Sequence, residues 1–88
     1  MKLLKITSEM LSLIRSCRDL NQAEFSFYMR VPQARLSDLE TAKIPITKHY
    51  EDKIWNALES LHISSEELQH IYELVQIKNN KQNTKVEL

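Results

Sequence analysis

Residues 21–43, NQAEFSFYMRVPQARLSDLETAK, decide the expected fold, because they contain a helix start, a sharp break and a second helix start. Asn21 can cap the first helix, and Glu24 three residues later completes a capping box. Pro32 marks the break, since proline disfavours helical backbone in the residue before it and is accepted in a first helical turn. We therefore predict two short helices joined by a tight turn, the first ending near Tyr28 and the second spanning about residues 32–41.

The apolar residues of this segment separate a buried side from an outer side. Leu36 and Leu39, with Val31 just before the helix, give the second helix a narrow apolar face. Two short helices that cross at a steep angle need a small residue at the crossing, and Ser26 is suitably small. The outer face of the second helix is polar and uncrowded, and consists of Gln33, Ala34, Arg35, Ser37 and Asp38.

Helical periodicity continues on both sides of this pair. Apolar residues recur at helical spacing within residues 7–18, 47–61 and 64–78, and Ser64 with Glu67 forms a second capping box. The chain has no glycine and only two prolines, a composition that disfavours strand-rich folds. We predict an all-α fold of five helices, in one domain over residues 1–78, followed by a disordered polar tail over residues 79–88.

The composition narrows the class of protein. A chain of 88 residues that is 42% hydrophobic and 27% charged is typical of one soluble domain. The single cysteine, Cys17, cannot form an intrachain disulfide and is expected to be a small core residue. No apolar stretch approaches the ~20 residues of a membrane span, so we expect a cytoplasmic protein without a membrane partner.

Charge alone does not indicate a nucleic-acid partner. The net charge is zero, and a pI near 6.8 lies below the basic values typical of many DNA-binding domains. The charges are unevenly distributed, since residues 1–55 carry nine basic and seven acidic residues and residues 56–88 carry three and five. A mildly basic body with an acidic C-terminal part is compatible with one DNA-facing side.

The segment resembles the helix-turn-helix of the Xre family, the bacterial and phage regulators that include lambda repressor and Cro. Gln22 lies where the family has a glutamine opening its first motif helix, and Phe25 and Ser26 lie on its buried large-then-small pair. Further matches are Val31 in the turn, Leu36, Ser37 and Glu40 in the second helix, and Lys43 and Pro45 in the following loop. The resemblance covers roughly residues 11–68 and implies a five-helix, lambda-repressor-like domain.

Three positions depart from the family pattern. Arg30 and Ala42 stand where the family has glycine, and both would be mildly strained if their backbone were left-handed. Pro32 replaces the usual Ser or Thr and has no hydroxyl or amide to donate to a phosphate. The resemblance also implies a partly buried ion pair between Arg15 and Glu40, so Arg15→Ala is expected to unfold far more readily than Arg18→Ala.

The family's mode of binding places the second helix in the major groove, where its first residues reach base edges. The base-facing candidates are Gln33, Ala34, Arg35 and Asp38. Gln33 can bond to adenine, and Ala34 can touch a thymine methyl or serve only helix propensity. Asp38 can accept from cytosine or simply pair with Arg35. The phosphate-facing candidates are Asn21, Gln22, Ser37, Thr41 and Lys43.

The resemblance implies a sequence-specific transcriptional regulator, more often a repressor, that binds double-stranded palindromic DNA as a homodimer and needs no cofactor. The alternative is an antitoxin, which would bind a toxin as protein partner and autoregulate its operon. Surplus apolar residues off the main helical stripes, a common feature of dimer or partner interfaces, are Trp55, Leu74 and Ile77. No catalytic set is evident, and His49, His62 and His70 lack the spacing of metal ligands.

Overall fold

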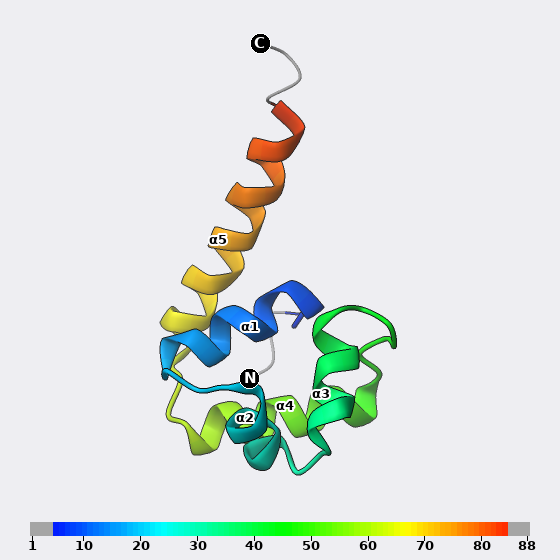
Figure 1. Cartoon of the computed structure of the whole chain (residues 1–88). Helices are drawn as coiled ribbons and strands as arrows, with labels where there is room; N and C mark the ends of the chain where they lie inside the picture. Colours follow the sequence, from blue (N-terminus) through cyan, green and yellow to red (C-terminus); the bar gives the residue numbers. More distant parts are fainter. Residues whose placement is uncertain (1–4, 85–88) are drawn as a thin grey trace.

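The computed structural model describes residues 5–84, and over this range it consists of five α-helices without a strand. The helices are α1 (Ser8–Cys17), α2 (Gln22–Met29), α3 (Gln33–Glu40), α4 (Lys48–Ser60) and α5 (Ser65–Thr84). The first four gather into one body, while α5 starts beside α1 and projects well beyond that body (Figure 1). The expected all-α class is therefore confirmed.

The helices enclose one hydrophobic core to which all five contribute. Both sides of α1 are used, because α1 contacts α3 as well as α5, and Met10, Leu11 and Ile14 are fully buried. The apolar faces expected for the later helices are also buried, with Leu36 and Leu39 on α3. The remaining buried apolar residues are Ile6, Phe25, Met29, Ile54, Ala57, Leu58, Leu68, Ile71 and Val75.

The two predicted capping boxes are both present. The Asn21 side-chain oxygen accepts from the backbone N–H of Glu24 at 2.8 Å, and the Glu24 carboxylate accepts from the N–H of Asn21 at 2.9 Å. At the start of α5, Ser64 and Glu67 make the same reciprocal pair, both at 3.1 Å. Each box satisfies amides that no intrahelical carbonyl can reach. These starts are confirmed.

Residues with a left-handed backbone conformation follow the ends of α1, α2, α3 and α4 in this glycine-free chain. The φ angles are 57° at Asp19, 62° at Arg30, 62° at Ala42 and 57° at His62. Arg30 and Ala42, which were expected to be mildly strained if their backbone were left-handed, both adopt this conformation. A residue with a Cβ pays about 1–2 kcal/mol in this conformation, which the surrounding packing must offset.

The expected end of the last helix was wrong. α5 continues to Thr84 instead of stopping near Lys78, so residues 79–84 of the expected disordered tail are helical, and residues 85–88 lie outside the described residues. The physical reason is that no glycine or proline follows Lys78 to stop the helix.

Two expected burial states also differ from the structure. Cys17 is exposed instead of part of the core, because it lies at the C-terminal end of α1, one turn past the last buried residue, Ile14. Trp55 is partly buried and packs against the core, so it offers less free surface to a partner than expected. Leu74 and Ile77 do remain exposed, by 55% and 60%.

Candidate nucleic-acid interface

The helix pair formed by α2 and α3 is held by a short and well-bonded turn. Arg30 adopts the left-handed conformation after α2, which lets the N–H of Val31 return to the carbonyl of Ser26 at 3.1 Å. Pro32 occupies the N-cap of α3, one position before the expected first turn, and its carbonyl accepts from the N–H of Arg35 at 2.9 Å. Ser26 is buried to 5% exposure, which agrees with its expected place as the small residue of the pair.

A polar network ties α3 to the two preceding helices. Arg15 on α1 donates from Nε to Glu40 Oε2 at 2.6 Å and from Nη2 to Oε1 at 3.1 Å. The amide of Gln22, the first residue of α2, donates to the same Oε1 at 2.9 Å. Arg15 also donates to the carbonyl of Leu20, just before α2. The end of α3 is thereby attached to both α1 and α2.

The Arg15–Glu40 pair is largely removed from water, since their side chains are 19% and 8% exposed. The geometry is the two-pronged one in which an arginine satisfies both carboxylate oxygens, the strongest form of protein ion pair. Because the pair joins α1 to the C-terminal end of α3, it fixes how α3 lies against α1. The outer residues of α3 are consequently presented in one defined direction.

Three consecutive side chains, Gln33, Ala34 and Arg35, are exposed in the first turn of α3. Asp38, one turn later, is partly buried, and its carboxylate lies 3.7 Å from the Arg35 guanidinium. The alternative in which Asp38 pairs with Arg35 is therefore present in the structure. Such a partly exposed pair is weak, so either partner can exchange it for another polar group.

The residues expected to face phosphates lie around the start of α2, on α3 and in the loop after it. They differ in which of their hydrogen-bond donors are free. Gln22 shares its amide with Glu40, and the hydroxyl of Thr41 donates to the carbonyl of Ser37 at 2.9 Å. Asn21 is exposed, although its side-chain oxygen is used by the capping box. Lys43 is exposed in the loop after α3, and it is the one charged residue of the set.

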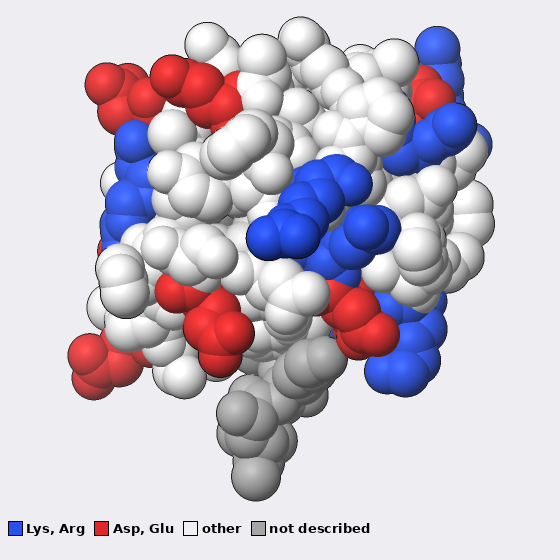
Figure 2. All heavy atoms as spheres, turned by 90° about the horizontal axis from the view of Figure 1, so that it is seen from below, with Lys and Arg blue, Asp and Glu red and all other residues white. Residues whose placement is uncertain are grey.

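Charges of both signs are interspersed on the molecular surface. Figure 2, which views the molecule from the side where α2 and α4 lie in Figure 1, shows basic side chains in the middle of this face and at its left and right margins, with acidic side chains beside them. No continuous basic field covers this face. Any binding of nucleic acid by such a surface would depend on oriented polar contacts more than on bulk charge.

Arg18 has a structural role that the sequence did not reveal. Its guanidinium makes two 2.8 Å hydrogen bonds to the Glu67 carboxylate and also donates to the carbonyls of Leu61 and His62. The hydrogen bonds that the Glu67 carboxylate accepts from Arg18, together with those from Ser64, lower the pKa of Glu67 from 4.5 to about 2. Arg18→Ala is therefore not a suitable control for the destabilisation expected of Arg15→Ala, because both arginines hold distant elements together.

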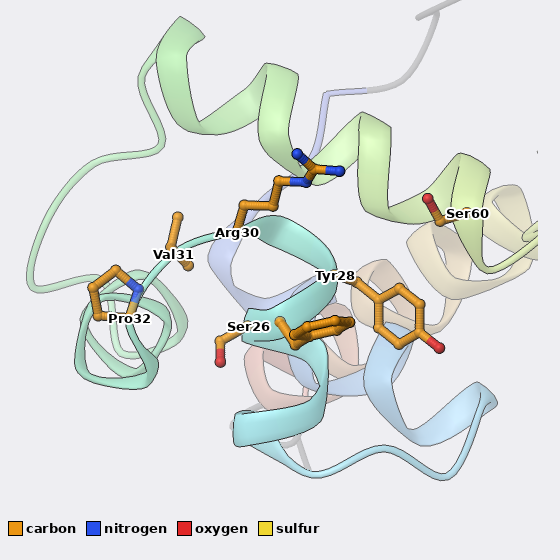
Figure 3. A pocket seen from close by; sticks show the side chains of 7 residues that line it. Ser26, Tyr28, Arg30, Val31, Pro32 and Ser60 are labelled. Carbon is orange, nitrogen blue, oxygen red and sulfur yellow. The ribbon is translucent and has the colours of Figure 1, made fainter.

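Two exposed aromatic residues on α2 were also missed. Phe27 is 77% exposed and Tyr28 is 37% exposed, although both lie inside the motif. They border an open hollow of about 760 Å³ beside the turn between α2 and α3. Figure 3 shows this hollow between Tyr28 on one side and Val31 and Pro32 on the other, with Arg30 lying toward α4. The signal was two successive aromatics outside the buried pattern of α2.

The described part of the chain offers little support for a metal site or a membrane-spanning helix. Within residues 5–84, no group of three His, Cys, Asp or Glu side chains is close enough to hold a metal ion. His62 lies in a left-handed turn, and His49 packs edge-to-face on Tyr50 at 5.0 Å. Over the same range, no helix has both the length and the apolar character needed to cross a membrane.

No protein-family model, curated protein or solved structure matches this chain. The functional argument therefore depends on the residues of α2 and α3 and on the elements that hold them.

Proposed function

We propose that this protein is a sequence-specific DNA-binding transcriptional regulator of the Xre type, with a lambda-repressor-like arrangement of its five helices. The observation that carries the proposal is the exposed first turn of α3, with Gln33, Ala34 and Arg35, on a helix attached to α1 and α2 through Glu40. A helix held in this way can enter the major groove while the start of α2 lies on the backbone.

The chemistry of the α3 surface agrees with direct reading of bases. The Gln33 amide can donate to and accept from adenine in the major groove, and the adjacent methyl of Ala34 can contact thymine. Arg35 can bond to guanine once its weak pair with Asp38 opens. Lys43 would add a phosphate contact that positions the domain without reading sequence.

Regulators of this kind act on palindromic operators as homodimers, because two-fold protein symmetry matches the symmetry of the site. The exposed Leu74 and Ile77 on the projecting helix α5 support a protein partner. A second copy would give a repressor dimer. A toxin bound there would make the protein an autoregulating antitoxin, and neither role changes the proposed use of α3.

The deciding experiment selects bound duplexes from a random DNA pool and then measures binding to the selected operator and its point mutants. Gln33→Ala is expected to cost about 1–3 kcal/mol per half-site and to relax preference at one base position. In a dimer the loss appears symmetrically in half-sites about one DNA turn, roughly 34 Å, apart.

Gln76→Ala is the matched control, because Gln76 is an exposed glutamine on a helix, but on α5. It should leave affinity and base preference unchanged, with helical content equal to that of Gln33→Ala. An unaltered base preference in a folded Gln33→Ala variant would contradict the assignment of this residue. Failure of the wild-type chain to enrich any duplex would contradict DNA binding itself.

A further inference from the structure

The outer side of α2 carries a pair of aromatic residues that the core does not use. On the same helix, Phe25 and Met29 are buried to 0% and 1% exposure, while Phe27 is 77% exposed and Tyr28 is 37% exposed. The two exposed rings pack edge-to-face, with centroids 5.9 Å apart and planes at 81°. We call Phe27 and Tyr28 the aromatic ridge, and its packed geometry makes it one raised apolar feature.

The aromatic ridge stands between two open hollows. The larger hollow, of about 760 Å³, extends from the ridge to Val31 and Pro32. The smaller hollow, of about 400 Å³, extends from the ridge toward Leu20 and Ala23 and has more apolar than polar lining. A ridge with an apolar hollow on each side can interlock with a second ridge of the same shape. A single exposed phenylalanine on a flat surface could not do so.

The charges around the ridge are complementary to one another. Glu24 lies three residues before Phe27 and borders the smaller hollow, while Arg30 lies three residues after Phe27 and borders the larger one. If two α2 helices pack antiparallel with Phe27 at the two-fold axis, Glu24 of each copy lies opposite Arg30 of the other, and the exposed Arg30 side chain turns from its direction toward α4 to meet it. Isologous contacts of this kind are the commonest way in which soluble chains form dimers.

We propose that the aromatic ridge and its two hollows form a self-association surface whose occupant is α2 of a second copy of this chain. The association needs no DNA, and it places the second copy on α2 instead of α5, which leaves the exposed Leu74 and Ile77 for a different protein. The ring of one copy fills a hollow beside the ring of the other, and the two symmetric Glu24–Arg30 pairs fix the antiparallel orientation.

The first test measures self-association of the full chain by sedimentation equilibrium over a concentration series without DNA. Phe27→Gln is expected to raise the dimer dissociation constant by about 30-fold, the usual effect of removing a central aromatic from an interface. The double variant Leu74→Gln with Ile77→Gln is the control and should change the constant by less than about threefold. Circular dichroism checks that each variant keeps its helical content.

The second test uses charge reversal and does not depend on comparing stabilities. Glu24→Lys alone places two like-charged pairs across the interface, as does Arg30→Glu alone, so each variant should dimerise more weakly than wild type. Mixing the two variants creates opposite charges at both pairs, and the mixture should form heterodimers more strongly than either variant self-associates. The loss of half the α2 capping box in Glu24→Lys affects that chain equally in both measurements.

Several results would overturn the proposal. A wild-type chain that stays monomeric over the series would do so, and the ridge would then be left for a different protein. Unchanged self-association in folded Phe27→Gln, with dissociation of the α5 double variant, would place the interface on α5. A mixture of the charge variants that associates no better than its components would exclude the antiparallel arrangement. None of these results bears on base reading by α3.

Discussion

Removal of Arg15 should destabilise the protein by a large and calculable amount. Glu40 is 8% exposed and accepts three hydrogen bonds, two of them from Arg15 and one from Gln22. Arg15→Ala leaves this carboxylate buried with a single donor, and it also frees the carbonyl of Leu20. Breaking a buried pair from one side costs about 3–5 kcal/mol, and the remaining Gln22 donor favours the lower end, near 3.

That loss is large on the scale of the whole domain. At about 0.05–0.15 kcal/mol per residue, a chain of 88 residues has a total stability of about 4–13 kcal/mol. Arg15→Ala therefore removes at least about a fifth of the free energy of unfolding. Lys48→Ala is the matched control, since its partner lies 3.5 Å away and the Lys48 side chain is 81% exposed, and its loss should be below about 1 kcal/mol.

The assay is urea unfolding followed by circular dichroism and by the fluorescence of Trp55. Adding Glu40→Gln to Arg15→Ala should recover about 1–2 kcal/mol, because a neutral amide is cheaper to bury than an unpaired carboxylate. Equal unfolding midpoints for Arg15→Ala and Lys48→Ala, or no recovery in the double variant, would refute the reasoning that a buried charge pair holds α3.

Three further predictions concern other parts of the molecule. Hydrogen bonds from Arg18 lower the pKa of Glu67 to about 2, so the ionised carboxylate stabilises the fold above pH 4.5 and this contribution is lost as the pH falls toward 2. The urea midpoints of wild type and Glu67→Gln should therefore differ near neutrality and converge in acid. Ala42→Gly should raise stability by about 1 kcal/mol and the thermal midpoint by about 4–8 °C, whereas Ala57→Gly, inside α4, should lower both. Lys43→Ala should weaken binding to all duplexes alike and reduce the salt slope by about one per bound copy, and a change confined to one base position would contradict a phosphate contact.

Local features of the fold were predictable from the sequence because their geometry is local. The capping boxes at Asn21 and Ser64 require only a carboxylate three residues on, and helix geometry brings these groups together in any context. For Arg30 and Ala42 the sequence predicts only that a left-handed backbone would be strained, and the structure shows that both residues adopt it. The buried faces of the helices followed from their 3.6-residue period.

Features that depend on a distant neighbour were not predictable. Periodicity shows that α1 has a wide apolar surface, but not that Cys17 lies past the end of what α3 and α5 cover. Likewise, Trp55 lies off the main stripe of α4 yet packs against the core. Arg18 reaches Glu67 across 49 residues, a contact that no local pattern encodes.

The same distinction between local features and distant contacts applies to the candidate site. Exposure of Gln33, Ala34 and Arg35 follows from the position of Leu36 and Leu39 on the opposite side of one helix. The donation by Gln22 to Glu40 does not follow from spacing, since it depends on how α2 and α3 cross. The sequence therefore predicts which side chains face outward, while the packing decides which of their donors remain free.

The left-handed helix ends bear on how long the protein survives in a cell. Four residues with side chains stand where glycine would be unstrained, and together they cost on the order of 4 kcal/mol. That energy corresponds to a roughly thousandfold larger unfolded fraction than a glycine-containing chain would have. Proteases degrade the unfolded fraction, so the strain shortens the lifetime of the protein once its synthesis stops. For the proposed regulator, rapid clearance would let its target genes respond within the time of its own decay, and glycine at these four turns would slow that response.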